Sequence, residues 1–138
     1  MLPLVFDEYS SDTLADLLRE DADVTVWWGT RAECSVATSR LRREGGLDEG
    51  GEESTRDVLD VLAETWIEIR PTDDLRLLAT LVSKYHPLRT ADCFQFAAAL
   101  RWCEGETRDA GFVCLDDRLR NAAKNEGFVV LPETMELA

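Results

Sequence analysis

The chain has 138 residues, of which 45% are hydrophobic and 31% are charged, a composition typical of one soluble globular domain spanning residues 1–138. Acidic residues outnumber basic ones by 28 to 15, and the formal net charge of −13 excludes a nucleic-acid-binding protein that works by bulk electrostatic attraction. No apolar run approaches the ~20 residues that span a bilayer and nothing resembles a signal peptide, so we expect a cytoplasmic protein without a membrane segment.

Helix-like and strand-like segments alternate along the chain, and this order predicts an α/β fold with a mainly parallel sheet. The helices that apolar periodicity and capping residues predict are 11–19, 30–43, 52–65, 72–85, 90–104 and 117–126. The predicted strands are 24–28, 66–69, 112–115 and 128–131.

Local signals set the expected ends of several helices. Gly45 and Gly46 stop helix 30–43, and Glu49 to Gly51 form an acidic, glycine-rich linker after them. Thr72 and Thr90 are expected to act as N-caps. In helix 52–65 the residues expected to face the core are Val58, Leu59, Val61 and Leu62.

The segment from Leu88 to Leu100 is the most informative part of the chain. It is apolar nearly all round a helix and should therefore be buried, yet it carries Asp92 in its first turn. Asp116 ends a later apolar strand, and Glu33 lies in the first turn of another predicted helix. Because the carboxyl ends of parallel strands and the starts of the following helices share one sheet edge, these three acids could converge there.

Each acid also has a purely structural interpretation. Glu33 fits a capping box with Thr30, in which the glutamate side chain bonds the backbone N–H of the cap residue. Asp92 would be stabilised by the helix dipole, and Asp116 could cap the helix that begins at Asp117. These alternatives stay open at this stage, and it is the combination of three acids that favours a shared site.

Three carboxylates at one edge would repel one another unless a cation balanced them. Oxygen ligands without histidine or thiolate favour Mg²⁺ or Mn²⁺, which can activate water and stabilise charge on a phosphate ester. The chain has a single histidine, His86, which is expected in the loop before the Asp92 helix. The four cysteines form no C-x-x-C pair and are expected in the core: they are Cys34, Cys93, Cys103 and Cys114.

Three blocks of the sequence resemble the PIN-domain ribonucleases of the VapC toxin type. They are Thr30–Ala37, Leu88–Leu100 with its Thr-Ala-Asp helix start, and Phe112–Leu119, which is followed by the apolar run Val129–Leu131. The match extends from about residue 4 to residue 132. One departure is Cys114, which stands where the family usually has Thr or Ser. The resemblance implies a PIN-like three-layer α/β/α fold.

The resemblance also implies a metal-dependent endoribonuclease like the toxin of a type II toxin–antitoxin pair. Glu33, Asp92 and Asp116 would hold Mg²⁺ or Mn²⁺, and a metal-bound water would attack the RNA phosphodiester. Asp117 would be a neighbour that points away from the site. The implied partners are an RNA substrate, a second copy in a homodimer, and an antitoxin whose basic segment fills the acidic site.

The family's first strand, which ends in a further acidic ligand, has no clear counterpart in the chain. One interpretation places that strand upstream of Met1, so that the chain is a shortened copy. In another, Leu2–Phe6 supplies the strand and Asp7 supplies the acid, although Pro3 is unfavourable in a central strand. The alternative function is therefore a catalytically inactive PIN-like module that only binds a protein. The patterns typical of phosphate receivers and haloacid-dehalogenase-like phosphatases are absent from the sequence.

Overall fold

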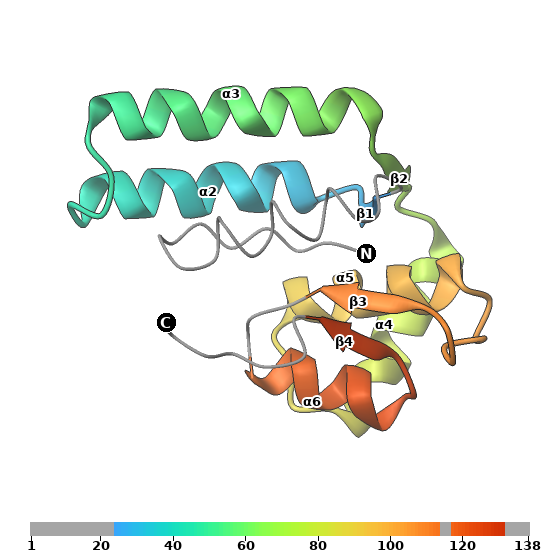
Figure 1. The fold of residues 1–138 in the computed structure, drawn as a ribbon. Helices are drawn as coiled ribbons and strands as arrows, with labels where there is room; N and C mark the ends of the chain where they lie inside the picture. The colour runs from blue at the N-terminus through green and yellow to red at the C-terminus, as the bar shows by residue number, and fades with distance from the viewer. Residues whose placement is uncertain (1–23, 114–116, 132–138) are drawn as a thin grey trace.

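The computed structural model describes residues 24–113 and 117–131. These residues form five helices and four short strands, with one or two helices between successive strands, which confirms the predicted α/β class (Figure 1). The elements are β1 (Thr25–Trp27), α2 (Thr30–Arg43), α3 (Glu49–Thr65), β2 (Ile67–Ile69), α4 (Asp73–Tyr85), α5 (Thr90–Trp102), β3 (Gly111–Val113), α6 (Asp117–Asn125) and β4 (Val129–Leu131). The predictions for 11–19, Leu2–Phe6, Asp7, Cys114 and Asp116 fall outside the described residues. None of the described helices has the length and apolar character needed to cross a membrane.

The described strands form two parallel pairs. β1 lies beside β2, with Thr25 opposite Ile67, and β3 lies beside β4, with Gly111 opposite Val129. The parallel direction confirms the prediction, but the described strands do not join into the single sheet that the sequence suggested. Side chains connect the pairs instead, because α5 packs against β1 and shares one hydrophobic core with β3 and β4.

The larger hydrophobic core centres on three phenylalanine rings. Phe96 of α5 contacts Phe112 of β3 and Phe128, with ring centroids 5.9 Å apart in both pairs. Phe112 and Phe128 are themselves 5.4 Å apart. The buried part of α5 also includes Cys93, Gln95 and the run Ala97–Ala99, and both α4 and α6 pack against this helix. The prediction that this helix is buried nearly all round is therefore confirmed.

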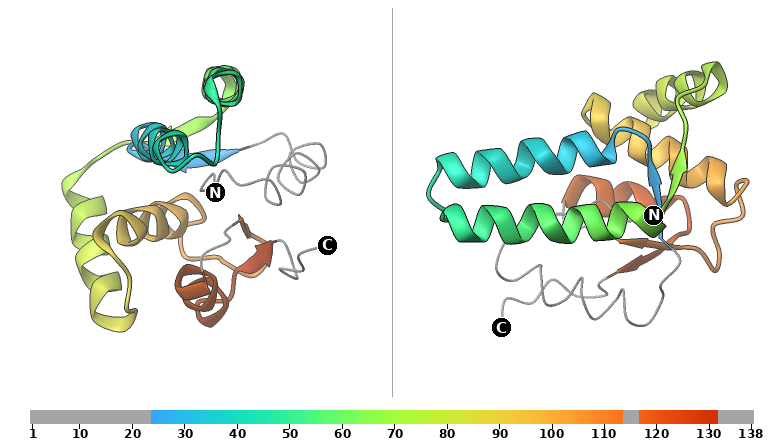
Figure 2. Two further views of the ribbon diagram at one scale, coloured as in Figure 1. Left: turned by 90° about the vertical axis from the view of Figure 1, so that its left-hand side faces the viewer. Right: turned by 90° about the horizontal axis from the view of Figure 1, so that it is seen from above.

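A smaller core joins β1 to α2 and α3, which lie side by side and run in opposite directions (Figures 1 and 2). Its buried residues are Val26, Cys34, Leu59 and Trp66. Arg56 of α3 donates hydrogen bonds to the hydroxyls of Ser35 and Ser39 at 3.0 and 2.9 Å. Arg31 of α2 also pairs with Asp60 of α3 at 2.6 Å. The two helices are thus held by a few apolar side chains and by polar contacts beside them.

The structure corrects the predicted start of α3. The helix begins at Glu49 rather than Glu52, because Asp48 Oδ1 accepts a hydrogen bond from the Gly51 N–H at 2.7 Å and caps the first turn. The segment Glu49–Gly51 is therefore part of a helix and not a linker.

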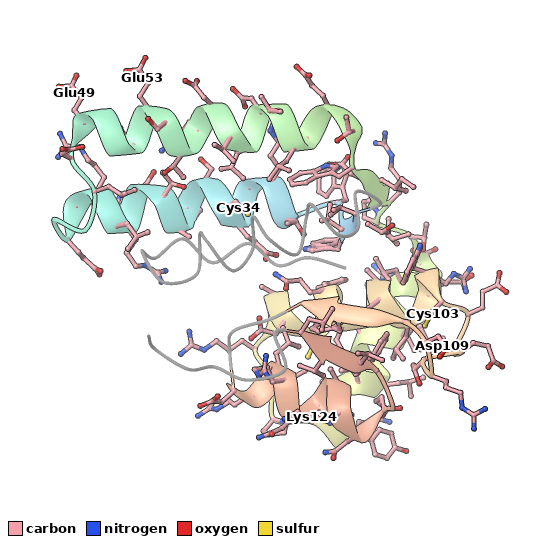
Figure 3. The ribbon with its side chains drawn as sticks, viewed as in Figure 1. Cys34, Glu49, Glu53, Cys103, Asp109 and Lys124 are labelled. Carbon is pink, nitrogen blue, oxygen red and sulfur yellow. The ribbon has the colours of Figure 1, made fainter. Side chains whose placement is uncertain are left out.

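The buried face of α3 is narrower than the sequence predicted. Leu59 is buried and Leu62 is partly buried, as expected, but Val58 and Val61 are 53% and 63% exposed. α3 packs mainly against α2, so the stripe that faces α2 is the covered one. Figure 3 shows acidic side chains such as Glu53 pointing from α3 away from α2.

Three capping predictions have different outcomes. Thr72 is the N-cap of α4, and its side chain accepts a hydrogen bond from the Leu75 N–H at 3.1 Å, as predicted. Thr90 is not an N-cap, because Arg89 still has an extended backbone and takes that position, without a side-chain cap bond. Gly45 follows α2 with a φ of 81°, in the left-handed region that glycine favours, so the predicted stop is confirmed.

Candidate functional site

Residues of α2 and α6, together with the N-terminal end of α5, line an open cavity of about 570 Å³. The cavity brings together Glu33 of α2 and Asp92 of α5, two acids that lie far apart in the sequence. The rest of its lining comprises apolar side chains and three arginines, Arg40, Arg89 and Arg118. The structure thus places two of the three candidate acids at one site, and Asp116 falls outside the described residues.

Glu33 does not form the capping box that its spacing from Thr30 allows. The N-cap of α2 is Gly29, which has no side chain to cap the helix, and Thr30 is the first helical residue. The carboxylate of Glu33 instead accepts hydrogen bonds from Nε1 of Trp27, at 2.8 Å, and from Nε2 of Gln95. Its two oxygens are therefore held by donors from β1 and α5.

Packing fixes the Trp27 ring that donates to Glu33. The ring stacks on Phe94 of α5, with centroids 4.9 Å apart and planes 18° apart. Gly29 lies so close to the ring that a Cβ at this position would be 2.4 Å from Trp27 Cζ2, so glycine is required there. The indole N–H is thus presented to Glu33 by the packing of β1 against α5.

Burial raises the pKa of Glu33 above its ordinary value of 4.5, because the charged carboxylate loses hydration. The hydrogen bonds from Trp27 and Gln95 lower this pKa and offset part of the effect, whereas the negative charge of Asp92 raises it further. Burial, and then the same Asp92 charge, also raises the pKa of the Cys93 thiol. A bound cation would relieve the repulsion between the two acids.

Gln95 is a site residue that sequence reasoning did not identify. It is 7% exposed, and its Oε1 has no hydrogen-bond partner among the described residues. The available signal is its position between Phe94 and Phe96, as a polar side chain in a helix that is otherwise apolar nearly all round. Trp27 gives no comparable signal, because a tryptophan in an apolar strand is usually a core residue.

Three arginines complete the polar lining of the cavity. Arg40 lies in the last turn of α2, Arg89 is the N-cap of α5, and Arg118 is the second residue of α6. Within residues 24–113 and 117–131, none of these three forms an ion pair or a side-chain hydrogen bond. A guanidinium group in this state is available to an oxyanion of a ligand, which it can bind through two parallel N–H donors.

In the part of the chain that the structure describes, no cluster of three or more His, Cys, Asp or Glu side chains could hold a metal ion. Glu33 and Asp92 supply two carboxylates at the cavity. Mg²⁺ is usually bound by one or two carboxylates with water completing its coordination, so this pair fits the donor chemistry of that ion. The hydrogen bonds to Glu33 fit as well, because carboxylates that bind metals are commonly held by neighbouring donors.

His86 and the described cysteines do not line the cavity. His86 is buried at the end of α4, and its Nε2 lies 3.1 Å from Glu126 Oε1, so it connects α4 to the end of α6. Cys34 and Cys93 are buried, as expected of core residues, and Cys103 is partly buried.

No protein-family model matches the chain, and neither a curated protein nor a solved structure matches it. The resemblance to PIN-domain ribonucleases therefore stays a prediction from the three sequence blocks. A function has to be argued from the cavity and from the residues that line it.

Proposed function

We propose that the chain is a metal-dependent endoribonuclease with a PIN-like three-layer α/β/α fold, resembling the toxin of a type II toxin–antitoxin pair. The observation that supports this proposal best is the pairing of Glu33 and Asp92 at one cavity. The two acids belong to two of the three sequence blocks that resemble the PIN family. Metal-dependent phosphodiester hydrolysis uses carboxylates to bind the cation and benefits from positive charge near the phosphate, and the cavity lining carries both kinds of group.

Glu33 and Asp92 would hold Mg²⁺ or Mn²⁺, and we assign Asp116 as the third acid of the site. When bound, such an ion activates a water molecule and stabilises negative charge on the phosphate. Arg118 lines the cavity and lies two residues after Asp116 in the chain, which supports this assignment. Trp27 and Gln95 would keep the Glu33 carboxylate in a fixed orientation.

The raised pKa of Glu33 has a consequence for metal binding. A proton and a metal ion compete for the same carboxylate oxygens, so the affinity for the ion should increase as the pH rises through the pKa of Glu33. Burial thus moves the pH range in which a proton competes with the metal ion upward from that of an exposed glutamate.

The proposed partners follow from the same function. They are an RNA substrate, a homodimeric second copy, and an antitoxin whose basic segment would meet Glu33 and Asp92. Exposed apolar side chains on α4, namely Leu77, Leu81 and Tyr85, recur on one helix face and give a second copy a surface to cover. Light scattering of the purified chain distinguishes a dimer from a monomer. We also propose that the protein acts in the cytoplasm.

The Asp92→Asn variant tests the catalytic proposal. It removes a negative charge from the cavity but keeps the shape of the side chain, so we expect RNA cleavage with Mg²⁺ or Mn²⁺ to fall by at least about a hundredfold. The matched control is Asp109→Asn, which makes the same change at an exposed acid outside the cavity and should leave cleavage unchanged. Thermal unfolding of both variants shows whether the fold is intact. Undiminished cleavage by Asp92→Asn would contradict the proposal.

A catalytically inactive module that binds only a protein partner is the second candidate. The observation that favours it is that just two acids lie at the cavity among the described residues. Calorimetric titration with Mn²⁺ separates the two functions, because the ribonuclease must bind the ion. An absence of binding at millimolar Mn²⁺ would favour the inactive module.

A further inference from the structure

Basic side chains outnumber acidic ones in the lining of the cavity, whereas acidic residues outnumber basic ones in the chain as a whole. The whole protein has a net charge of −13, yet the cavity is lined by two carboxylates and three guanidinium groups. These arginines come from three different parts of the chain, so their convergence is a property of the tertiary structure. Because bulk attraction of a polyanion is excluded by the overall charge, a local group of arginines is the feature that could bind one.

Arg40 lies on the same helix as Glu33, about two turns further along α2. Glu33 and Arg40 are seven residues apart, which places them on the same side of the helix and about 10 Å apart along its axis. Val36 and Ala37 lie between them and also line the cavity, so the cavity is continuous from Glu33 to Arg40. Arg89, in contrast, precedes Asp92 by only three residues.

We propose that Arg40 binds a backbone phosphate adjacent to the phosphate that is cleaved, so that the cavity accepts a single-stranded oligonucleotide rather than an isolated phosphate ester. This inference rests on the proposed function, because it takes Glu33 and Asp92 as the cleavage site. An arginine is suited to this role because its planar guanidinium group binds phosphate through two N–H donors. A single strand can bend into a concave cavity, whereas the phosphates of a rigid duplex would also meet the acidic outer surface.

The first measurement is binding of a fluorescein-labelled single-stranded RNA in EDTA, where no cleavage occurs. Each phosphate contact to a single strand contributes about 0.7 to the slope of log affinity against log salt, which corresponds to about fivefold in affinity at 0.1 M salt. We therefore expect Arg40→Ala to weaken binding by about fivefold and to reduce the salt slope by about 0.7. The matched control is Arg42→Ala, which removes an exposed arginine on nearly the opposite side of α2 and should change neither quantity.

The second measurement is hydrolysis of bis(p-nitrophenyl) phosphate with Mn²⁺. This small diester has no neighbouring phosphate, so Arg40→Ala should reduce its hydrolysis by a smaller factor than it reduces RNA binding, and Arg42→Ala should reduce neither. The inference would be overturned by unchanged RNA binding in Arg40→Ala, by equal weakening in Arg42→Ala, by a parallel loss of small-diester hydrolysis in Arg40→Ala, or by equally tight binding of a duplex. If the wild type hydrolyses neither RNA nor the small diester, the proposed function fails and the position of Arg40 relative to a cleaved phosphate fails with it, whereas the binding assay in EDTA still decides whether Arg40 contacts an RNA phosphate.

Discussion

The two helices that each bring one acid to the cavity are built in different ways. α5 is buried nearly all round, and Asp92 sits at the start of a helix whose body is part of the main core. α2 buries only a stripe of three residues, Thr30, Cys34 and Thr38, and its opposite side is exposed. Core packing therefore positions Asp92, whereas the position of Glu33 depends on two hydrogen bonds from outside its own helix.

This difference indicates how the site should respond to substitution. A change in the body of α5 should affect the stability of the whole domain, and the site with it. A change in the donors to Glu33 should affect one carboxylate and leave most of the fold unchanged. Three substitutions test this contrast, beginning with the largest expected effect.

Phe96→Ala should have the largest effect, because it removes the central ring of the main core. Phe96 is completely buried and contacts the rings of His86, Phe112 and Phe128. The loss of buried area and the cavity left behind should lower the free energy of unfolding by about 3–5 kcal/mol, measured by urea denaturation. The matched control on α2 is Val36→Ala. The Val36 side chain is 55% exposed, so this substitution should lower the free energy of unfolding by less than about 0.5 kcal/mol. A similar decrease in the free energy of unfolding for both variants would contradict the proposed difference between α5 and α2.

Trp27→Phe should have an intermediate effect. It keeps an aromatic ring beside Phe94 but removes the N–H that donates to Glu33, and a hydrogen bond to a charged group contributes about 1.5–3 kcal/mol. The measurement is again urea denaturation, with Trp28→Phe as the control, because Trp28 is 49% exposed and makes no side-chain hydrogen bond to the described residues.

A double-mutant cycle isolates the hydrogen bond from the change in ring size. Glu33→Gln is combined with Trp27→Phe, and the pairwise term reports the interaction between the indole N–H and the carboxylate. A coupling free energy indistinguishable from zero would show that Trp27 acts only through packing.

The bodies of the helices could be predicted from the sequence, and several of their ends could not. Apolar periodicity and a terminal glycine predict α2 with the bounds that the structure shows. The start of α3 depends on Asp48, whose carboxylate reaches the Gly51 N–H, and this bond converts a glycine-rich stretch that looks like a linker into helix. The division of the strands into two pairs was also unpredictable, because strands of three residues carry little information about which neighbours they pair with.

The candidate site was predictable in part for a similar reason. The position of Glu33 and Asp92 at helix starts predicts that they meet, since this property follows from the chain order of an α/β fold. The choice between a capping box and a site at Glu33 could not be made from spacing, because it depends on donors from Trp27 and Gln95, which are tertiary neighbours. The arginines are still harder to predict, since surface arginines are common and only the fold shows which of them converge.

Glu33→Gln should have the smallest effect of the three substitutions, because hydrogen bonds already offset part of the cost of burying the charge. The pKa of Glu33 is raised in the folded protein, so the stability linked to its protonation is fully present below pH 4.5 and is lost as the pH rises through the raised pKa. The variant is uncharged at every pH. It should therefore be more stable than the wild type at pH 7, and this difference should disappear at about pH 4. Urea denaturation across this pH range measures the difference.

The neutral side chain in Glu33→Gln also changes the hydrogen bonding of Gln95. Oε1 of Gln95 has no partner among the described residues. If the side-chain amide of Gln95 rotates by about 180°, this oxygen can accept a hydrogen bond from the amide N–H that the substitution introduces at position 33. The control is Glu53→Gln, which makes the same change at an exposed residue on the outer side of α3 and should show no pH-dependent gain. An equal gain in both variants would show that the overall charge of −13, rather than burial of Glu33, sets the pH dependence. A gain confined to Glu33→Gln would identify Glu33 as a residue that is kept charged at a cost in stability, as expected of a group that binds a cation.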